Sequence, residues 1–331
     1  MQLLEGNVGY IDIRGFAGME TGKAMADAYM KLIERSDAII IDLTRNGGGS
    51  PHTVQYLCSY FFDEEVHLNS LYWREGDRTD EFWTVEVDGI QHPDIPLFVM
   101  TSHYTFSGAE EFSYNMQTQK RATLVGQTTG GGANPGGGRM LNEYLTVFIP
   151  TGMAINPITG TNWEGVGVVP DIQTDPDSCF SITHQLAMEA AENYRARRRA
   201  MYTEKIGRLY TQLETYKAGY SEEVILSLLS DCVMHHIYEE WEINIMGYDY
   251  LMQYEKPRIA QCIFHANTIL FPESANTFDS YGESLVATGD LEQAAESYRK
   301  AVELAEAHHD PNAQLFRDNL DRVLQMIREK K

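Results

Sequence analysis

A serine with a glycine after it and a glutamate three residues later lies in the stretch Thr-Phe-Ser-Gly-Ala-Glu, which ends at Glu110. The buried strand expected over Pro96–Thr101 and the helix expected over Ser107–Gln119 place Ser107 where the helix begins. A capping box of Ser107 and Glu110 is the structural interpretation of this spacing. The catalytic interpretation is a serine nucleophile with the Gly108 N–H beside it as an oxyanion donor. One serine can do both.

Two further features are of types that acyl transfer uses, a glycine loop that can bind an anion and an isolated acidic residue. Gly47–Gly49 follow the apolar run Ala38–Leu43. Three successive glycines let backbone N–H groups point at one spot and hold an anion. An ordinary Gly-rich turn is the alternative for this loop. Glu164 lies between Trp163 and Gly165, and a solvated surface charge is the alternative for it.

A serine hydroxyl is a poor nucleophile until a base accepts its proton, so nearby histidines matter. His103 lies four residues before Ser107, and His52 closely follows the glycine loop. A surface or capping histidine is the alternative for both. The other eight histidines show no pairing that suggests a metal site, and no cofactor is expected.

Taken together, these segments resemble the tail-specific (C-terminal-processing) family of serine peptidases, and within it the interphotoreceptor-retinoid-binding-protein-like branch. The resemblance covers about Gly6 to Gln173. It implies an α/β fold with a crotonase-like ββα layered core. Five segments occur in family order: Gly9–Arg14, Asp42–Gly49, Thr105–Glu110, Val125–Gly132 and Trp163–Asp171.

The resemblance implies a role for each matching residue. Ser107 would be the nucleophile of a serine endopeptidase. Gly108, through its N–H, and Gly48 would form the oxyanion hole. Glu164, 57 residues after Ser107 (164 − 107), matches the acid that orients the base in the Ser-His-Glu members.

The family base has no matching residue. Many members carry a lysine in the Gly-rich segment, where this chain has Gly132, and Lys120 lies too early to match it. The other members use a histidine upstream of the first strand, whereas no histidine here precedes His52. His52 and His103 are therefore the substitute bases to consider. A longer natural chain or a partner could also supply the base.

Three functions follow from these observations. The first is a peptidase acting on peptides or unstructured protein tails. The second is a catalytically silent module that binds a peptide or a small apolar ligand in the same cleft. The third is a scaffold in which the C-terminal repeats bind a protein partner.

The first half of the chain alternates between strand and helix patterns, which predicts a mixed sheet covered by helices. An exposed strand pair is expected over Leu68–Arg74 and Phe82–Val87, and a strand near an edge over Tyr144–Pro150. The strands expected in the main sheet are Val8–Arg14, Ala38–Leu43, Pro96–Thr101 and Ala122–Gly126. Helices are expected over Glu20–Arg35, His52–Phe62 and Ser107–Gln119.

The second half contains a repeat. Gly247, Ala260, Phe264 and Pro272 fall in the order of a tetratricopeptide unit, and Gly282, Ala294, Tyr298 and Ala301 repeat it. The alanines and the aromatics are each 34 residues apart (294 − 260, 298 − 264) and the glycines 35 (282 − 247). We therefore predict a catalytic core over 1–175, a helical connector over 176–240 and all-α repeats over 241–331. Glu222–Tyr238 is a candidate for a degenerate preceding unit, and Asn312–Lys331 is expected to form a capping helix.

Bulk properties exclude some partners. The 331 residues suit two domains, and the formal net charge of −22 argues against nucleic acid or an anionic membrane as a partner. No membrane-spanning run and no secretory signal is expected, although the family is mostly extracytoplasmic. The four cysteines lack metal-ligand spacing, so buried free thiols are expected.

Overall fold

The computed structural model describes residues 1–330 and divides the chain into two compact units, Met1–Arg197 and Arg198–Lys331. The division falls inside one helix, α4 (Pro176–Glu214), rather than at the boundary expected near residue 175. The reason is that the first part of α4 supplies side chains to the core of unit 1.

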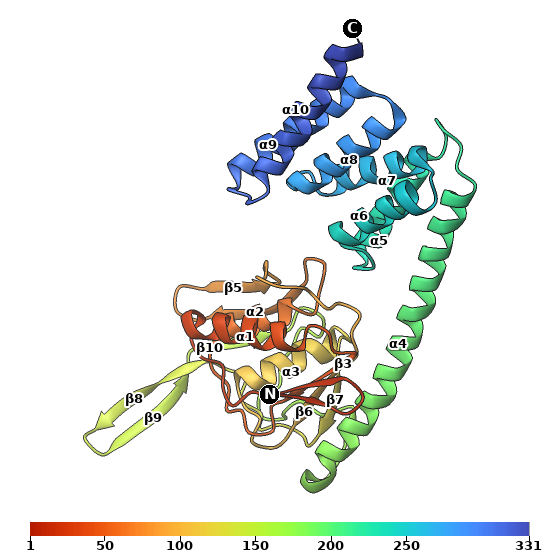
Figure 1. The fold of residues 1–331 in the computed structure, drawn as a ribbon. Helices are drawn as coiled ribbons and strands as arrows, with labels where there is room; N and C mark the ends of the chain where they lie inside the picture. Colours follow the sequence, from red (N-terminus) through yellow and green to blue (C-terminus); the bar gives the residue numbers. More distant parts are fainter. Residues whose placement is uncertain (331) are drawn as a thin grey trace. The chain divides into compact units, whose positions relative to one another are not determined.

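Unit 1 is built on a six-stranded sheet with the order β1-β2-β3-β6-β7-β11 (Figure 1). Strand β1 is antiparallel to its neighbour, and the other pairings are parallel. The sheet confirms the expected α/β class. Its strands are Gln2–Leu4, Val8–Asp12, Ala38–Asp42, Leu97–Thr101, Thr123–Gly126 and Ile172–Gln173 for β1, β2, β3, β6, β7 and β11.

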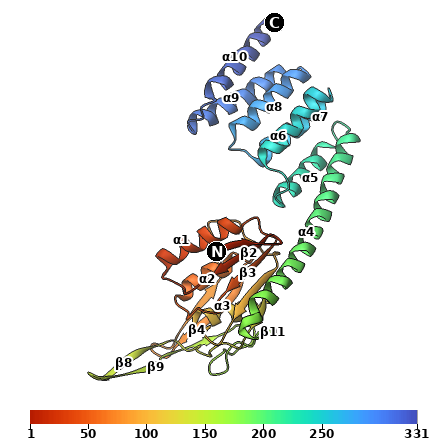
Figure 2. The same cartoon turned by 60° about the horizontal axis from the view of Figure 1, so that its bottom comes forward.

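Helices cover both faces of this sheet, as a continuous apolar strand such as β3 requires. Alternate side chains of β3 face opposite ways, so Ile39 and Ile41 join one core and Ala38 and Ile40 another. Helices α1 (Met19–Ile33), α2 (Pro51–Ser59) and α3 (Gly108–Thr118) pack on the first core, and α4 packs on the second (Figure 2).

Two smaller β structures extend unit 1. A three-stranded antiparallel sheet has the order β10-β4-β5, formed by Gly152–Ile155, His67–Trp73 and Arg78–Trp83. The second strand of the expected exposed pair is thus β5, which ends at Trp83 and begins earlier than predicted. Its charged residues point outward, which hides the strand pattern from a search for apolar runs.

A hairpin of β8 (Gly136–Asn142) and β9 (Leu145–Pro150) projects from unit 1 (Figure 1). The edge strand expected over 144–150 is therefore one arm of a separate two-stranded sheet. Every residue of both strands is exposed, including the apolar Met140, Leu145 and Phe148, and so is Tyr144 in the turn between them. At the base, the N–H groups of Thr151 and Gly152 both donate to the Pro135 carbonyl.

Unit 2 is all helical. A glycine packs under an aromatic ring twice: a Cβ on Gly247 would lie 2.4 Å from a Phe264 ring carbon, and one on Gly282 would lie 2.8 Å from a Tyr298 ring carbon. The two contacts match the predicted repeat positions, while the tetratricopeptide identity stays a prediction. The helices are the end of α4, α5 (Glu222–Met234), α6 (Glu240–Tyr248), the π-helix η1 (Asp249–Gln253), α7 (Pro257–Leu270), α8 (Ala275–Thr288), α9 (Leu291–Ala307) and α10 (Ala313–Lys330).

All four cysteines are buried free thiols, as expected. Across residues 1–330, no helix combines the length and the apolar character needed to cross a membrane. Lys331 lies outside the described residues.

Candidate active site

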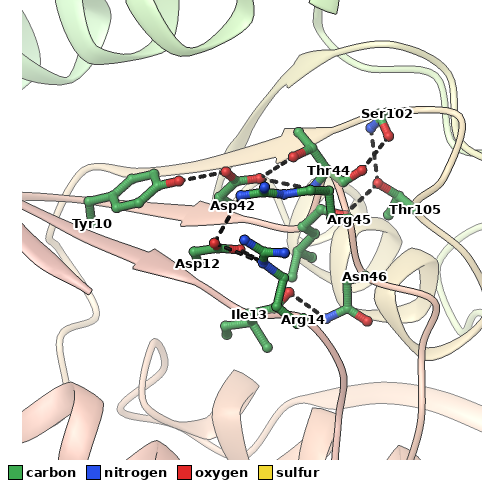
Figure 3. A network of polar contacts seen from close by, with 11 residues as sticks. Tyr10, Asp12, Ile13, Arg14, Asp42, Thr44, Arg45, Asn46, Ser102 and Thr105 are labelled. Carbon is green, nitrogen blue, oxygen red and sulfur yellow. Dashed lines mark hydrogen bonds and ion pairs between the residues drawn. The ribbon is translucent and has the colours of Figure 1, made fainter.

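The loops that follow β3 and β6 lie side by side at the carboxyl end of the sheet (Figure 3). Side chains of one loop bond the backbone of the other, so the two loops form one structure. The joining hydrogen bonds run from Ser102 Oγ to the Thr44 carbonyl (2.5 Å), from Thr105 Oγ1 to the Leu43 carbonyl (2.8 Å) and from the Phe106 N–H to the Asn46 carbonyl (3.0 Å).

Asn46 shapes the glycine loop from within. Its side chain is fully buried, its Nδ2 donates to the Ile13 carbonyl (3.0 Å), and its Oδ1 accepts the Gly48 N–H (2.8 Å). Gly48 and Gly49 have φ angles of +101° and +142°, and a Cβ on Gly49 would lie 1.9 Å from the Phe16 carbonyl oxygen. Glycine is therefore required at these positions by backbone conformation and by close packing.

Ser107 holds an unusual backbone conformation. Its φ is 53° and its ψ is −123°, in a region that residues with a Cβ rarely adopt. The Ser107 N–H donates to a Glu110 carboxylate oxygen at 2.8 Å, which is one half of the capping box that the spacing predicts. The Glu110 N–H donates to the Ser107 carbonyl (2.8 Å) and not to the Ser107 hydroxyl. Strained backbone of this kind is concentrated at functional sites. The half-buried Ser107 side chain lies at the N-terminus of α3, where helix N–H groups have no intrahelical acceptor.

Glu110 does more than cap the start of α3. Its side chain is fully buried and accepts four hydrogen bonds. The donors are the Ser107 N–H (2.8 Å), Thr129 Oγ1 (2.5 Å), the Gly131 N–H (2.6 Å) and the Gly132 N–H (2.8 Å). One carboxylate thus fixes the Ser107 turn to the Gly-rich segment after β7. The capping-box spacing indicated only the first bond, because the other donors come from about 20 residues away.

The predicted oxyanion glycines lie against Ser107. A Cβ on Gly48 would lie 2.7 Å from the Gly108 nitrogen and 2.8 Å from the Ser107 Cβ, and one on Gly108 would lie 3.1 Å from the Gly49 nitrogen. The Gly48 N–H itself points at Asn46. The structure therefore brings Ser107, Gly48 and Gly108 together, with the Gly49 nitrogen as a neighbour that the sequence reasoning did not single out.

Glu164 contacts the Gly-rich segment rather than a histidine. Its exposed carboxylate accepts the N–H groups of Ala133 (2.8 Å) and Asn134 (2.9 Å). The Gly165 N–H donates to the Gly131 carbonyl (2.9 Å), so the turn around Glu164 lies close to this segment. No signal in the sequence indicates these backbone partners.

The two candidate bases lie elsewhere. His52 is exposed on α2 with its ring 5.3 Å from that of Phe82. His103 is exposed in the loop after β6, with Nδ1 3.3 Å from Gln127 Oε1 and its ring 3.9 Å from that of Tyr104. Among residues 1–330, no hydrogen bond joins the Ser107 hydroxyl to a histidine or lysine nitrogen.

Phe106 fills the position where a side chain of residue 132 would lie. A Cβ on Gly132 would be 2.1 Å from a Phe106 ring carbon. A residue larger than glycine at 132 therefore requires this half-exposed ring to move. The contact gives a physical reason for glycine at the place where many tail-specific peptidases carry lysine.

The chain is similar to several known peptidases. The chain is 31% identical over 111 residues to the tail-specific protease of Haemophilus influenzae, covering 33% of this chain and 15% of that protein. Among solved structures, it is similar to a photosystem II D1 C-terminal processing protease (23% identity, TM-score 0.42, 51% of this chain and 43% of that one). It is also similar to a putative peptidase from Parabacteroides merdae (20% identity, TM-score 0.45, 52% and 56%).

The aligned part of the chain thus spans well under two thirds of each of these relatives. The retinoid-binding-protein-like branch stays a prediction. The model of peptidase family S41 matches residues 7–174, which is about half of the chain. The match includes Ser107 and every strand of the main sheet except β1. The chain belongs to peptidase family S41.

Proposed function

We propose that this protein is a serine endopeptidase of the tail-specific type, which cleaves peptides or unstructured protein tails through Ser107. One observation carries the proposal. Ser107 has a strained backbone (φ 53°) at the start of α3 and lies against the backbone of Gly48. A hydroxyl placed between a helix N-terminus and a glycine loop suits attack on a carbonyl whose oxygen becomes negative.

In the proposed reaction, the Ser107 oxygen attacks the scissile carbonyl carbon and its proton passes to a base. The tetrahedral oxyanion accepts the Gly108 N–H and an N–H of the glycine loop. Collapse breaks the C–N bond, the protonated base gives its proton to the leaving amine, and water then hydrolyses the acyl-enzyme. Glu110 positions the Ser107 turn, and Glu164 is proposed as the acid that orients the base.

The proton acceptor reaches Ser107 in one of two ways under this proposal. Either His103 or His52 turns toward the hydroxyl, or another chain or a longer form of this one presents a group to it. A small soluble base distinguishes the two, because imidazole replaces an absent acceptor but adds little to one already in place.

The test is covalent labelling by a fluorophosphonate probe with and without imidazole. We expect labelling of the wild type and of the control Ser181→Ala, which lacks an exposed serine of α4, and none of Ser107→Ala. If imidazole raises the labelling rate, the acceptor is external. If His103→Gln or His52→Gln lowers the rate only without imidazole, that histidine is the base. Labelling that persists in Ser107→Ala, or is absent even with imidazole, contradicts the proposal.

A second candidate is a catalytically silent module that binds a peptide or a small apolar ligand at the Ser107 site. The packing of Phe106 over Gly132 favours it, because that ring occupies the place of a lysine base. Here β-casein, an unstructured protein, should bind without being cleaved, and Ser107→Ala should leave its affinity unchanged. Cleavage of β-casein that Ser107→Ala abolishes would favour the peptidase.

We further propose a crotonase-like layering for the core of unit 1 and tetratricopeptide repeats for residues 241–331, with a protein partner for the repeats. The support for the repeats is the twice-occurring contact of a glycine with an aromatic ring, in Gly247–Phe264 and Gly282–Tyr298.

A further inference from the structure

Unit 1 contains a pocket of about 450 Å³ on the α4 side of the sheet. It opens at the carboxyl ends of the parallel strands, lined by residues of β2, of the loops after β3, β6 and β7, and of the first turn of α4. Open α/β sheets commonly bind ligands at this edge. Ser107 does not line this pocket, and it begins the helix that packs on the opposite face.

Three large aromatic side chains, those of Tyr10, Tyr104 and Phe180, line the pocket among mostly polar residues. Tyr10 and Phe180 meet edge to face with ring centroids 5.5 Å apart, and Met100 and Cys179 lie beside them. Tyr104 and Phe180 leave 68% and 42% of their surface exposed. Exposed aromatic rings around a concave site favour an apolar, planar ligand group.

Asp42 is the acidic residue that lines the pocket, and its carboxylate already accepts hydrogen bonds from the protein. Asp42 accepts hydrogen bonds from Tyr10 Oη (2.6 Å), from the Thr44 N–H (2.9 Å) and from Thr44 Oγ1 (2.6 Å) (Figure 3). Its oxygens are therefore held by the protein, so the pocket does not select a cation through this residue.

The groups that remain for a ligand are donors. The Arg45 guanidinium uses one nitrogen on Asp12 (3.0 Å) and has further N–H groups. Asp12 also accepts Arg14 Nε at 2.7 and 2.8 Å, so it keeps a partner when Arg45 binds something else (Figure 3). The amide oxygen of Gln127 accepts a hydrogen bond from His103 Nδ1, so the amide nitrogen of Gln127 can donate to a ligand.

We propose that this pocket binds a small aromatic carboxylate, with the ring between Tyr104 and Phe180 and the carboxylate on Arg45 and Gln127. The geometry of a guanidinium matches a carboxylate through paired hydrogen bonds. Two sources share this chemistry: a free aromatic acid and the last residue of a peptide that ends in an aromatic side chain. The pocket is separate from Ser107, so the proposal does not depend on peptidase activity.

The test is calorimetric titration of the full chain at low salt with four probes. Phenylacetate represents the free acid, and N-acetyl-phenylalanine represents the peptide end. N-acetyl-phenylalanine amide and phenethylamine keep the ring but replace the carboxylate. We expect at least one of the two acids to bind saturably, and the amide and the amine to bind at least about tenfold more weakly, since a charge-assisted bond is lost. Equal binding of acid and amide, or no saturable binding of either acid, overturns the proposal.

Two arginines offer a matched pair of variants. Arg45 and Arg14 both pair with Asp12 and are exposed to 56% and 57%, but only Arg45 lines the pocket. Arg45→Gln should weaken binding of the acid at least about tenfold, while Arg14→Gln should stay within about twofold. Equal losses in the two variants would contradict the assignment. If Arg45→Gln fails to fold, Tyr104→Ala, which removes an exposed ring, should also weaken binding.

Ser107→Ala separates this pocket from the candidate active site. We expect it to bind the acid as the wild type does. If its affinity drops, or if the fluorophosphonate-labelled protein no longer binds the acid, the acid occupies the Ser107 site and the assignment to this pocket is wrong.

Discussion

Glu110 and Glu111 are consecutive buried carboxylates in the first turn of α3 with opposite surroundings. Glu110 receives four donors. Glu111 interacts with Asn69 and lies near Cys58, and burial raises its pKa to about 7. Burial that few donors offset favours the protonated form of a carboxyl group, as at Glu111.

Glu110→Gln should therefore destabilise the protein, by about 2–4 kcal/mol, because an amide group places N–H donors against the N–H groups that the carboxylate accepts. The Ser107 turn should loosen too, and fluorophosphonate labelling should slow. Urea unfolding at pH 8 measures the first effect. Glu111→Gln is the matched control, and an equal loss there would show that burial alone is responsible.

Glu111 makes the stability depend on pH. The folded protein holds the Glu111 proton up to about pH 7, whereas the unfolded chain releases it near its ordinary value of 4.5. The unfolded state thus binds fewer protons between these values, so stability falls as pH rises from 4.5 to 7, by about 3 kcal/mol, and then stays level. The difference between wild type and Glu111→Gln in urea unfolding isolates this effect. A difference that does not change with pH would contradict it.

Ser107 offers a test of backbone strain. At φ 53° and ψ −123°, glycine costs less than any residue with a Cβ. Ser107→Gly should therefore be more stable than Ser107→Ala by about 1–2 kcal/mol. At Ser113, in the interior of the same helix, the order should reverse, with glycine about 1 kcal/mol below alanine. Chemical denaturation of the four variants measures their free energies of unfolding. If Ser107→Gly is less stable than Ser107→Ala, the backbone at residue 107 is not strained.

At the scale of elements, the β8–β9 hairpin contributes no residue to the apolar cores of unit 1. All its residues are exposed, and two-stranded hairpins alone are marginally stable. Chymotrypsin should therefore cut first at Tyr144 or Phe148, while the aromatic residues of the core resist. Mass spectrometry of early fragments identifies the sites, and a first cut within the six-stranded sheet would contradict this expectation.

Four of the six strands of the main sheet, β2, β3, β6 and β7, could be predicted because they carry local signals, whereas the short β1 and β11 were missed. The apolar run at Ala38–Leu43 and the turn residues around it predict β3, and similar runs predict β6 and β7. The hairpin arm β8 was missed because its three glycines, Gly136–Gly138, break any alternation. Strand β10 was missed because only its pairing with β4 defines it.

The candidate site could be predicted in part. Local spacing identifies Ser107 and the glycine loop. The bonds from Glu110 to Thr129 and Gly131, and from Glu164 to Ala133, join segments far apart in the chain, and no periodicity records them. The roles assigned to Glu164, His52 and His103 stay predictions.

At the scale of the whole molecule, the two units have separate apolar cores. The clusters of unit 1 end at Tyr194, and those of unit 2 begin at Leu209. Differential scanning calorimetry should therefore show two transitions. Gly49→Ala should lower one and Gly282→Leu the other, each by at least about 5 °C, because each added side chain meets an atom that blocks it. A single transition, or one that both variants shift, would show that the units unfold together.

The β8–β9 hairpin also offers a position in unit 1 where a tag can be inserted. Its tip at Glu143 and Tyr144 touches no core cluster, and its base is held by the two bonds to the Pro135 carbonyl. An epitope or a small fluorescent domain inserted at this tip should leave the sheet, the Ser107 turn and the α4 pocket undisturbed. The same hairpin could thus report where the protein goes in a cell and with what it assembles, with both ends of the chain left untagged.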